Sequence, residues 1–261
     1  MSPVIDCHHH LLDEPEYAER LVAECDRLGI DRVCVSGLGE QFAMPDNDAV
    51  ARAVARFPGR IIGMYYLRLG REDASVVPSL RGRGFSGIKV TCPTRSYDDP
   101  SFYPIYEAAQ AHRLPILFHT GVVMRGPLDH RFDVNSARMR PVFLDAVARA
   151  FPELNIIIAH LGVPWYEEAA AMARFHPNLY VDLTGSPTGW RRSKPLSFYP
   201  EMFWWPGAAG KILFGTDVAI AEMEAVLRDY QQIAAELQVD EPTRRALFGE
   251  TMARLLGIAP A

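Results

Sequence analysis

The sequence predicts an α/β fold of the TIM-barrel, or (β/α)₈, type, and three observations lead to this prediction. Short, nearly continuous apolar runs recur eight times, as is typical of parallel strands covered by helices. Amphipathic helical segments lie between the runs. The length of 261 residues is close to that of such a barrel. Since no glycine-rich first turn points to an open doubly wound sheet, we expect one distorted barrel domain over residues 1–261.

In chain order, the expected strands are residues 4–7, 32–36, 61–67, 87–91, 115–119, 156–160, 179–183 and 212–217, each rich in β-branched or other apolar side chains. The expected helices are 15–28, 46–57, 100–112, 137–151, 165–175, 219–237 and 241–256. Four of them end at residues that do not continue a helix, which are Gly29, Pro58, Pro152 and Pro177. We expect eight strands, each followed by a helix, although these ranges identify no helix after residues 61–67 or 179–183.

Composition narrows the class of protein. Apolar residues make up 49% of the chain and the net charge is −5, which disfavours nucleic acid or a membrane surface as the partner. A chain of this length can bury a large core without disulfide bonds or structural metal ions, so a metal ion would be catalytic rather than structural. The cysteines form no paired framework, no signal peptide precedes the first strand, and no apolar run approaches membrane-spanning length. These features predict a cytoplasmic protein with free thiols.

The triplet His8-His9-His10 follows the first expected strand. Residues two apart in a strand point the same way, so His8 and His10 should project into the barrel mouth while His9 faces outward. A polar loop or part of a tag is the alternative for a histidine triplet. The natural-looking apolar run before it favours a pair of metal ligands instead.

His119 and His160 end two consecutive expected strands, at the end of a barrel where chemistry occurs. A single histidine in such a place is usually structural, but two in succession indicate function. Asp217 ends the last strand, where its alternative role is to cap the next helix. Lys89 lies within an apolar strand and either extends outward, binds a substrate anion, or is carboxylated and bridges two metals.

Together these residues resemble the amidohydrolase superfamily, more closely the amidohydrolase-related branch that includes decarboxylases of the aminocarboxymuconate-semialdehyde type. The resemblance spans the chain, and the matching segments are Ile5-Asp6-Cys7-His8-His9-His10, Gly87-Ile88-Lys89, His119-Thr120-Gly121, Ala159-His160-Leu161-Gly162, Phe214-Gly215-Thr216-Asp217 and the final stretch 249–257.

The resemblance implies a distorted barrel with one divalent ion at its mouth, most often zinc, with manganese as an alternative. By position, the implied ligands are His8, His10, His119 and Asp217. His160 matches a residue that is a general acid/base in single-metal members and a ligand in two-metal members. Lys89 matches the carboxylated lysine of two-metal relatives, so a second ion stays open.

The loops at the expected mouth are basic and aromatic. Residues 120–140 carry four arginines against two aspartates, and residues 184–200 carry three basic residues and no acid. All four tryptophans follow the sixth and seventh strands. We expect Lys89, Arg125, Arg191 and Trp190 to contact a small anionic substrate, while an interface within a homodimer explains the same composition equally well.

Our leading hypothesis is metal-dependent hydrolysis of a C–O or C–N bond in a carboxylated lactone or amide. A metal ion would lower the pKa of a bound water, Asp217 would accept its proton, and His160 would protonate the leaving group. The alternative is metal-dependent, non-oxidative decarboxylation of a carboxylated ring or semialdehyde. Decarboxylases of this type usually have longer chains with extra loop insertions, so the compact chain slightly favours hydrolysis. A TatD-type DNase ranks lower because Lys89 and Gly215 replace its usual glutamates. A catalytically silent binding barrel also ranks lower, because none of the expected metal-ligating residues is missing.

Overall fold

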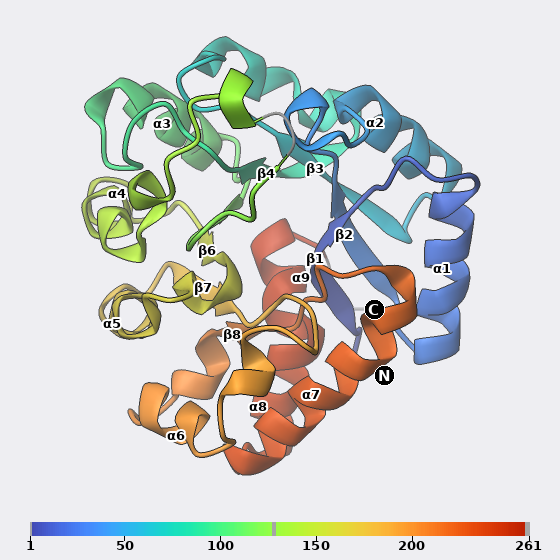
Figure 1. Cartoon of the computed structure of the whole chain (residues 1–261), viewed down its shortest axis with the longest axis vertical. Helices are drawn as coiled ribbons and strands as arrows, with labels where there is room; N and C mark the ends of the chain where they lie inside the picture. The colour runs from blue at the N-terminus through green and yellow to red at the C-terminus, as the bar shows by residue number, and fades with distance from the viewer. Residues whose placement is uncertain (1, 127–128, 259–261) are drawn as a thin grey trace.

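The computed structural model describes residues 2–126 and 129–258. Eight parallel strands form one sheet in chain order, and helices surround it (Figure 1). The strands are β1 (Ile5–His10), β2 (Arg32–Ser36), β3 (Ile61–Tyr66), β4 (Phe85–Val90), β5 (Ile116–Phe118), β6 (Ile156–Ile158), β7 (Leu179–Asp182) and β8 (Ile212–Leu213). The predicted TIM-barrel fold is confirmed.

The two ends of the sheet meet through backbone hydrogen bonds between β1 and the chain around β8. The Cys7 N–H donates to the Phe214 carbonyl at 2.9 Å, and the Asp217 N–H donates to the His8 carbonyl at 2.8 Å. We call this junction the β1–β8 seam. It brings the histidine triplet of β1 beside the aspartate that follows β8, although these residues are far apart in the sequence.

The helices are α1 (Tyr17–Leu28), α2 (Asn47–Arg56), α3 (Tyr103–Ala111), α4 (Leu144–Ala150), α5 (Tyr166–Phe175), α6 (Phe198–Met202), α7 (Met223–Glu236), α8 (Glu241–Arg245) and α9 (Thr251–Leu256). The outer faces of the strands pack against the surrounding helices in the larger core. Among the described residues, no helix is both long and apolar enough to cross a membrane.

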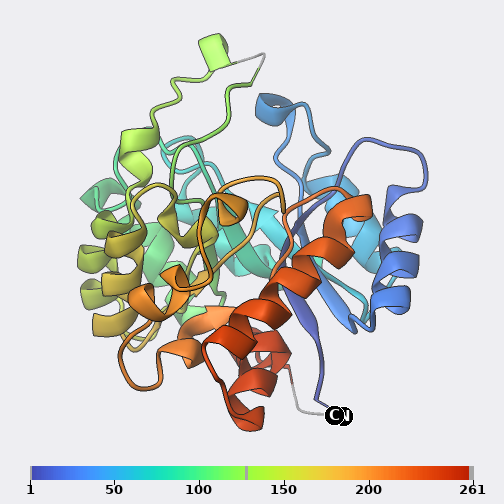
Figure 2. The same ribbon diagram turned by 60° about the horizontal axis from the view of Figure 1, so that its bottom comes forward.

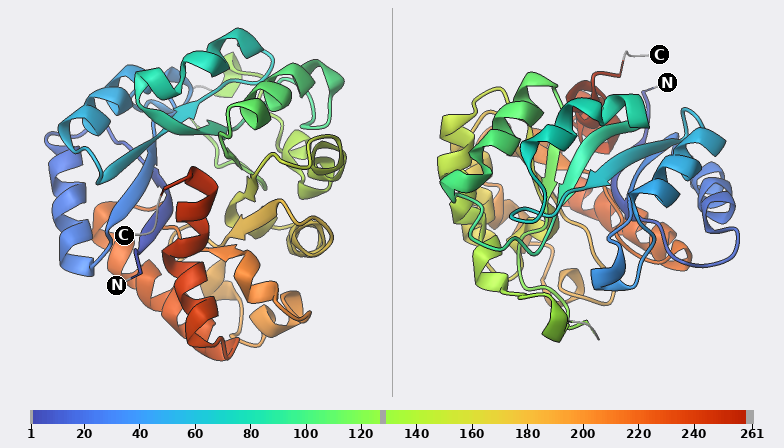
Figure 3. Two further views of the ribbon diagram at one scale, coloured as in Figure 1. Left: turned by 180° about the vertical axis from the view of Figure 1, so that it is seen from behind. Right: turned by 90° about the horizontal axis from the view of Figure 1, so that it is seen from above.

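Helix α9 closes the bottom of the barrel. Its Met252, Leu255 and Leu256 join a second core with inward-facing strand residues, including Ile5 and Leu117. The chain termini lie at this end, whereas the loops after β2 and β5 rise at the opposite end (Figures 2 and 3). The carboxyl ends of the strands therefore form the open mouth, where barrel enzymes carry their chemistry.

The expected ranges contained no helix after β3 or after β7, and the structure departs from the rule of one helix after every strand only after β3. Between β3 and β4 the chain forms only 3₁₀ helices, Ala74–Ser79 and Arg81–Arg83, because Pro78 interrupts the segment and Gly84 takes a positive φ of 91°. After β7, the short α6 was not predicted. The expected helix over residues 137–151 is also shorter, since α4 begins only at Leu144, after 3₁₀ turns that include Pro141.

Candidate metal centre at the barrel mouth

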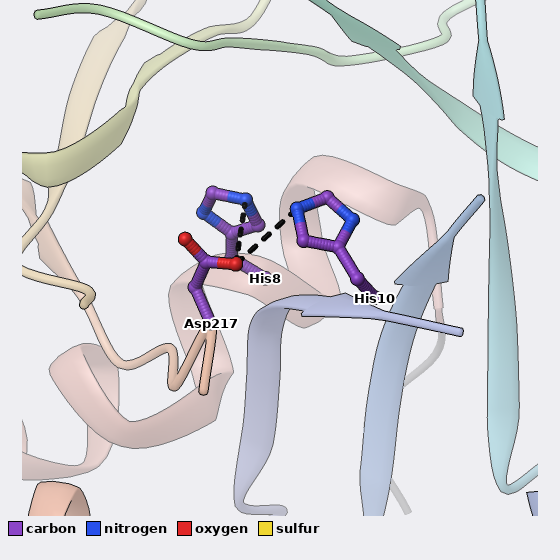
Figure 4. A group of neighbouring side chains, drawn as sticks. All are labelled: His8, His10 and Asp217. Atoms are coloured by element: carbon purple, nitrogen blue, oxygen red, sulfur yellow. Dashed lines mark ion pairs between the residues drawn. The ribbon is translucent and has the colours of Figure 1, made fainter. Parts of the chain in front are cut away.

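Three side chains converge at the β1–β8 seam: His8 and His10 from β1, and Asp217 from the turn after β8 (Figure 4). One carboxylate oxygen, Oδ1 of Asp217, lies 3.2 Å from His10 Nε2 and 3.9 Å from His8 Nε2. Asp217 has a left-handed φ of 47°, which is unusual for a residue other than glycine. The bond from its N–H to the His8 carbonyl holds this turn, so strain at the strand end serves to aim the carboxylate.

The far nitrogens of both imidazoles are already engaged. His8 Nδ1 lies 2.9 Å from Asp182 Oδ2, and His10 Nδ1 lies 3.2 Å from the Ser36 carbonyl oxygen. With these nitrogens donating, the lone pair of each ring is on Nε2, on the side of the ring that faces the site. Burial lowers the pKa of His8 to about 3 and holds that of His10 well below its ordinary value, so both rings are neutral.

This donor set fits a divalent cation. Two neutral imidazole nitrogens and a carboxylate oxygen are the ligands that zinc and similar ions take in catalytic sites. Without a cation or a proton between them, the lone pairs of His10 Nε2 and Asp217 Oδ1 would repel each other at 3.2 Å. Acceptors on the far ring nitrogens also match the usual environment of metal-binding histidines.

His119 and His160 lie beside this group but form a pair of their own. His160 Nε2 is 3.2 Å from His119 Nδ1 and 3.7 Å from Asp217 Oδ2. Burial lowers the pKa of His160 to about 4. His119 Nε2 is buried and finds no hydrogen-bond partner among residues 2–126 and 129–258. His119 is absent from the compact ligand group of His8, His10 and Asp217, so its role as a ligand stays a prediction.

Lys89 does not extend outward from the barrel. Its side chain is buried, and Nζ lies 2.9 Å from His8 Nε2, within the same site. Burial lowers the pKa of Lys89, and burial likewise raises the pKa of Asp217. The lysine therefore places a cationic group against the nitrogen that a metal ion would use.

Sequence reasoning missed two polar residues that support the site. Asp182 ends β7 fully buried and binds His8, and Thr184 lies two residues further on, with its Oγ1 2.8 Å from His160 Nδ1. The available signal was an acidic residue at the end of an apolar strand, the same signal that identified Asp217. The expected strand over 179–183 ran through Asp182, which concealed it as a strand-end residue.

A further buried network fixes the seam behind the site. Asp6 accepts hydrogen bonds from the Thr216 N–H and hydroxyl, at 3.0 Å and 2.6 Å, and from the His8 N–H. His9 faces away from the mouth, as the alternation of strand residues predicts, and bonds Thr216 and Tyr17. This network ties β1 to the chain after β8 and so holds the ligand group together.

The residues predicted to contact substrate are placed differently from one another. Arg125 is exposed in the loop after β5. Arg191 is buried, and its guanidinium donates to the Asp229 carboxylate at 3.1 Å and to the Leu183 carbonyl at 2.6 Å. Trp190 donates from Nε1 to the Thr184 carbonyl and packs against Tyr166. Arg191 and Trp190 thus brace the loop after β7, and contact with substrate stays a prediction for all three.

Comparisons with known proteins agree with this architecture. A family model described as Amidohydrolase matches residues 5–258. Among curated proteins, Protein fluG of Emericella nidulans is 29% identical over 69 residues, which are 26% of this chain and only 7% of that protein.

Several solved structures share the fold. An uncharacterized TIM-barrel protein from Bordetella bronchiseptica has a TM-score of 0.73 at 16% identity, covering 98% of each chain. A probable 2-pyrone-4,6-dicarboxylic acid hydrolase from Acinetobacter baumannii, with citric acid bound, gives 0.68 at 13%, covering 99% of this chain and 100% of the other. A 5-carboxyvanillate decarboxylase from Novosphingobium aromaticivorans, complexed with manganese and a nitrobenzoic acid, gives 0.65 at 16%, covering 98% and 96%.

Proposed function

The chain belongs to the amidohydrolase family, and from this premise we propose that it is a metal-dependent hydrolase that uses water to cleave a C–O or C–N bond in a small carboxylated substrate, such as a lactone or an amide. The proposed ion is one zinc per chain, with manganese as the alternative, held by His8, His10 and Asp217. His119 is the proposed additional ligand.

The observation that best supports hydrolysis is that the two carboxylate oxygens of Asp217 face different partners. Its Oδ1 faces the two imidazole Nε2 atoms, while its Oδ2 lies 3.7 Å from His160 Nε2. One oxygen can therefore bind an ion while the other exchanges a proton with a neutral histidine. Hydrolysis needs this arrangement because a proton must leave the attacking water and reach the departing oxygen or nitrogen.

A divalent ion bound here would act as a Lewis acid toward the substrate carbonyl and would lower the pKa of a neighbouring water molecule. Asp217 Oδ2 accepts the proton of the attacking water. His160 Nε2 receives that proton and delivers it to the leaving atom as the C–O or C–N bond breaks. His160 is buried, so bulk water does not compete for the proton during this transfer.

The substrate is proposed to be a small anion rather than a nucleic acid. The net charge of −5 supports this, and so does the exposed Arg125 in the loop above the mouth. Both the probable hydrolase and the decarboxylase named above are described as acting on carboxylated rings. The free thiols Cys7, Cys25, Cys34 and Cys92 support a reducing compartment, and we propose the cytoplasm.

Decarboxylation at the same site is the second candidate, because a structural neighbour with this fold is a decarboxylase complexed with manganese. The match with that decarboxylase covers 98% of this chain and 96% of the other, so the shared fold alone does not separate the two reactions.

The deciding experiment combines elemental analysis with a substrate panel. Metal-free protein is reconstituted with zinc or with manganese, and the wild type is compared with Asp217→Asn and His160→Ala. We expect about one ion per wild-type chain, loss of the ion and of activity in Asp217→Asn, and retention of the ion with at least a hundredfold loss of kcat in His160→Ala.

The panel contains lactones, amides and carboxylated aromatic acids, and products are followed as released acid and as released carbon dioxide. Acid release without carbon dioxide supports hydrolysis. Carbon dioxide release from the aromatic acids instead establishes the second candidate. Failure of the wild type to bind any divalent ion after reconstitution would overturn both.

A further inference from the structure

Asp182 is a fully buried carboxylate with both oxygens hydrogen-bonded by the protein. Its Oδ1 accepts from the His160 N–H at 2.7 Å, the Thr184 N–H at 3.0 Å and the Thr184 hydroxyl at 2.6 Å. Its Oδ2 accepts from His8 Nδ1 at 2.9 Å. Four donors surround a side chain that is 0% exposed. A carboxylate that is bonded in this way and has no exposed surface is not presented to a substrate, so we expect it to act through its partners.

One partner is His8. The carboxylate can only accept, so His8 Nδ1 must carry the hydrogen, and the lone pair of the ring is then on Nε2. Lys89 provides independent support because its ammonium, 2.9 Å from His8 Nε2, can only donate to that nitrogen. Both neighbours of the ring thus select the same tautomer. It is the tautomer that directs a lone pair into the ligand group.

The second partner is His160, which Asp182 reaches through Thr184. Because the Thr184 hydroxyl gives its hydrogen to Asp182, its oxygen must accept from His160 Nδ1 at 2.8 Å. His160 therefore also carries its hydrogen on Nδ1, and its Nε2 lone pair lies on the side of the mouth, 3.2 Å from His119 Nδ1 and 3.7 Å from Asp217 Oδ2. The backbone bond from the His160 N–H to Asp182 holds the left-handed conformation of His160, whose φ is 58°.

We propose that Asp182 is a positioning residue that fixes the Nδ1–H tautomer of His8 directly and of His160 through the Thr184 hydroxyl, so that both Nε2 lone pairs point into the mouth. The consequence for catalysis rests on the proposed function, whereas the tautomers themselves do not. Asp182 also lies close enough to His8 and His160 to form a compact group with them, but His8 Nδ1 and its oxygen Oδ2 are already joined at 2.9 Å.

The test reads the tautomers in metal-free protein by ¹⁵N NMR of the histidine side chains, with signals assigned from His8→Gln and His160→Gln. In the wild type, both rings should show Nδ1–H. In Asp182→Asn, the three donors at Oδ1 retain the amide oxygen, which turns the amide NH₂ toward His8. We expect His8 to gain Nε2–H character while His160 keeps its tautomer, and the zinc dissociation constant to rise about 10–100-fold.

Thr184→Val is the matched variant, because it removes the branch to His160 and keeps the 2.9 Å bond between His8 and Asp182, although the longer 3.3 Å contact of the hydroxyl with His8 Nδ1 is lost as well. His8 should keep Nδ1–H and zinc affinity should stay within about threefold, while His160 loses its single tautomer and kcat falls about tenfold or more at unchanged KM. Thr184→Ser should restore the single tautomer of His160 and the kcat of the wild type. If Asp182→Asn fails to fold, the Thr184 pair still tests the branch to His160.

Two results would overturn the proposal: an Nε2–H tautomer for His8 or His160 in the wild type, or unchanged tautomers and zinc affinity in folded Asp182→Asn and Thr184→Val. Failure of the proposed function is distinguishable from both. A wild type with the expected tautomers but no metal binding and no turnover would remove the hydrolase while the positioning role stands.

Discussion

Lys89 and a metal ion would compete for one nitrogen. The buried ammonium donates to His8 Nε2 at 2.9 Å, and an ion held by His8 requires that same lone pair. A positive charge this close also repels a cation, with little solvent to screen it. Binding an ion must therefore break the bond between Lys89 and His8 and move the ammonium away.

We predict that Lys89→Met binds zinc about tenfold more tightly than the wild type, at an unchanged ratio of one ion per chain. A hydrogen bond of a charged group contributes about 1.5–3 kcal/mol, and methionine nearly preserves the shape of the side chain. Calorimetric titration of metal-free protein measures both the zinc affinity and the number of ions per chain. Lys211→Met, directly before β8, is the control and should leave zinc affinity unchanged. A fall from two ions to one in Lys89→Met would instead identify Lys89 as a carboxylated bridge.

The spacing of single residues predicted part of the site. Two histidines two apart in a strand had to share a face, and Asp217 stood at the end of an apolar run. The role of a loop residue was harder to predict, because charge alone does not reveal direction. The basic loop containing Arg191 predicted a substrate contact, which stays a prediction, and it gave no sign of the bonds that the guanidinium makes to Asp229 and to the Leu183 carbonyl.

Arg191, in the loop after β7, bonds the carbonyl of Leu183, which directly follows that strand, and Asp229 on α7. Its side chain is almost wholly buried, whereas the carboxylate of Asp229 is 32% exposed. Removing the guanidinium would leave a buried carbonyl without its donor and a half-buried carboxylate without its cation.

Arg191→Ala should therefore lower the free energy of unfolding by about 2–3 kcal/mol, as measured by urea denaturation. Arg191→Lys should restore little of it, because an ammonium does not reproduce the planar fork of donors. Arg192→Ala is the matched control: this neighbouring arginine is exposed, and its loss should change stability by less than about 0.5 kcal/mol. Unchanged stability with a raised KM in Arg191→Ala would return this residue to substrate binding.

Periodicity predicted strands better than helices. All eight strands occur where apolar runs predicted them, because a parallel barrel strand is buried on both faces and its sequence shows this directly. The segment between β3 and β4 forms only 3₁₀ turns. Its buried Val77 and Leu80 join the core on the outer side of the strands, where a helix would otherwise pack. Such tertiary compensation is not visible in the local pattern.

The ligand group spans the weakest junction of the barrel. Strand β8 is only two residues long, and β1 meets the chain around it through a few backbone hydrogen bonds. His8 and His10 belong to one side of this seam and Asp217 to the other. An ion held by all three would bridge the first and last strands of the sheet, so metal binding and the stability of the whole barrel should be coupled.

We therefore predict that saturating zinc raises the melting temperature of the metal-free protein by about 5–10 °C. Ligand at a hundred times its dissociation constant adds about 2.7 kcal/mol to stability, and about 2–4 °C per kcal/mol is typical of a chain of this size. Calorimetry with and without a chelator measures the shift. Asp217→Asn removes one side of the bridge and should abolish the increment, whereas replacing the exposed His112 should preserve it. An equal increment in Asp217→Asn would mean that zinc stabilises the protein from a site other than the seam.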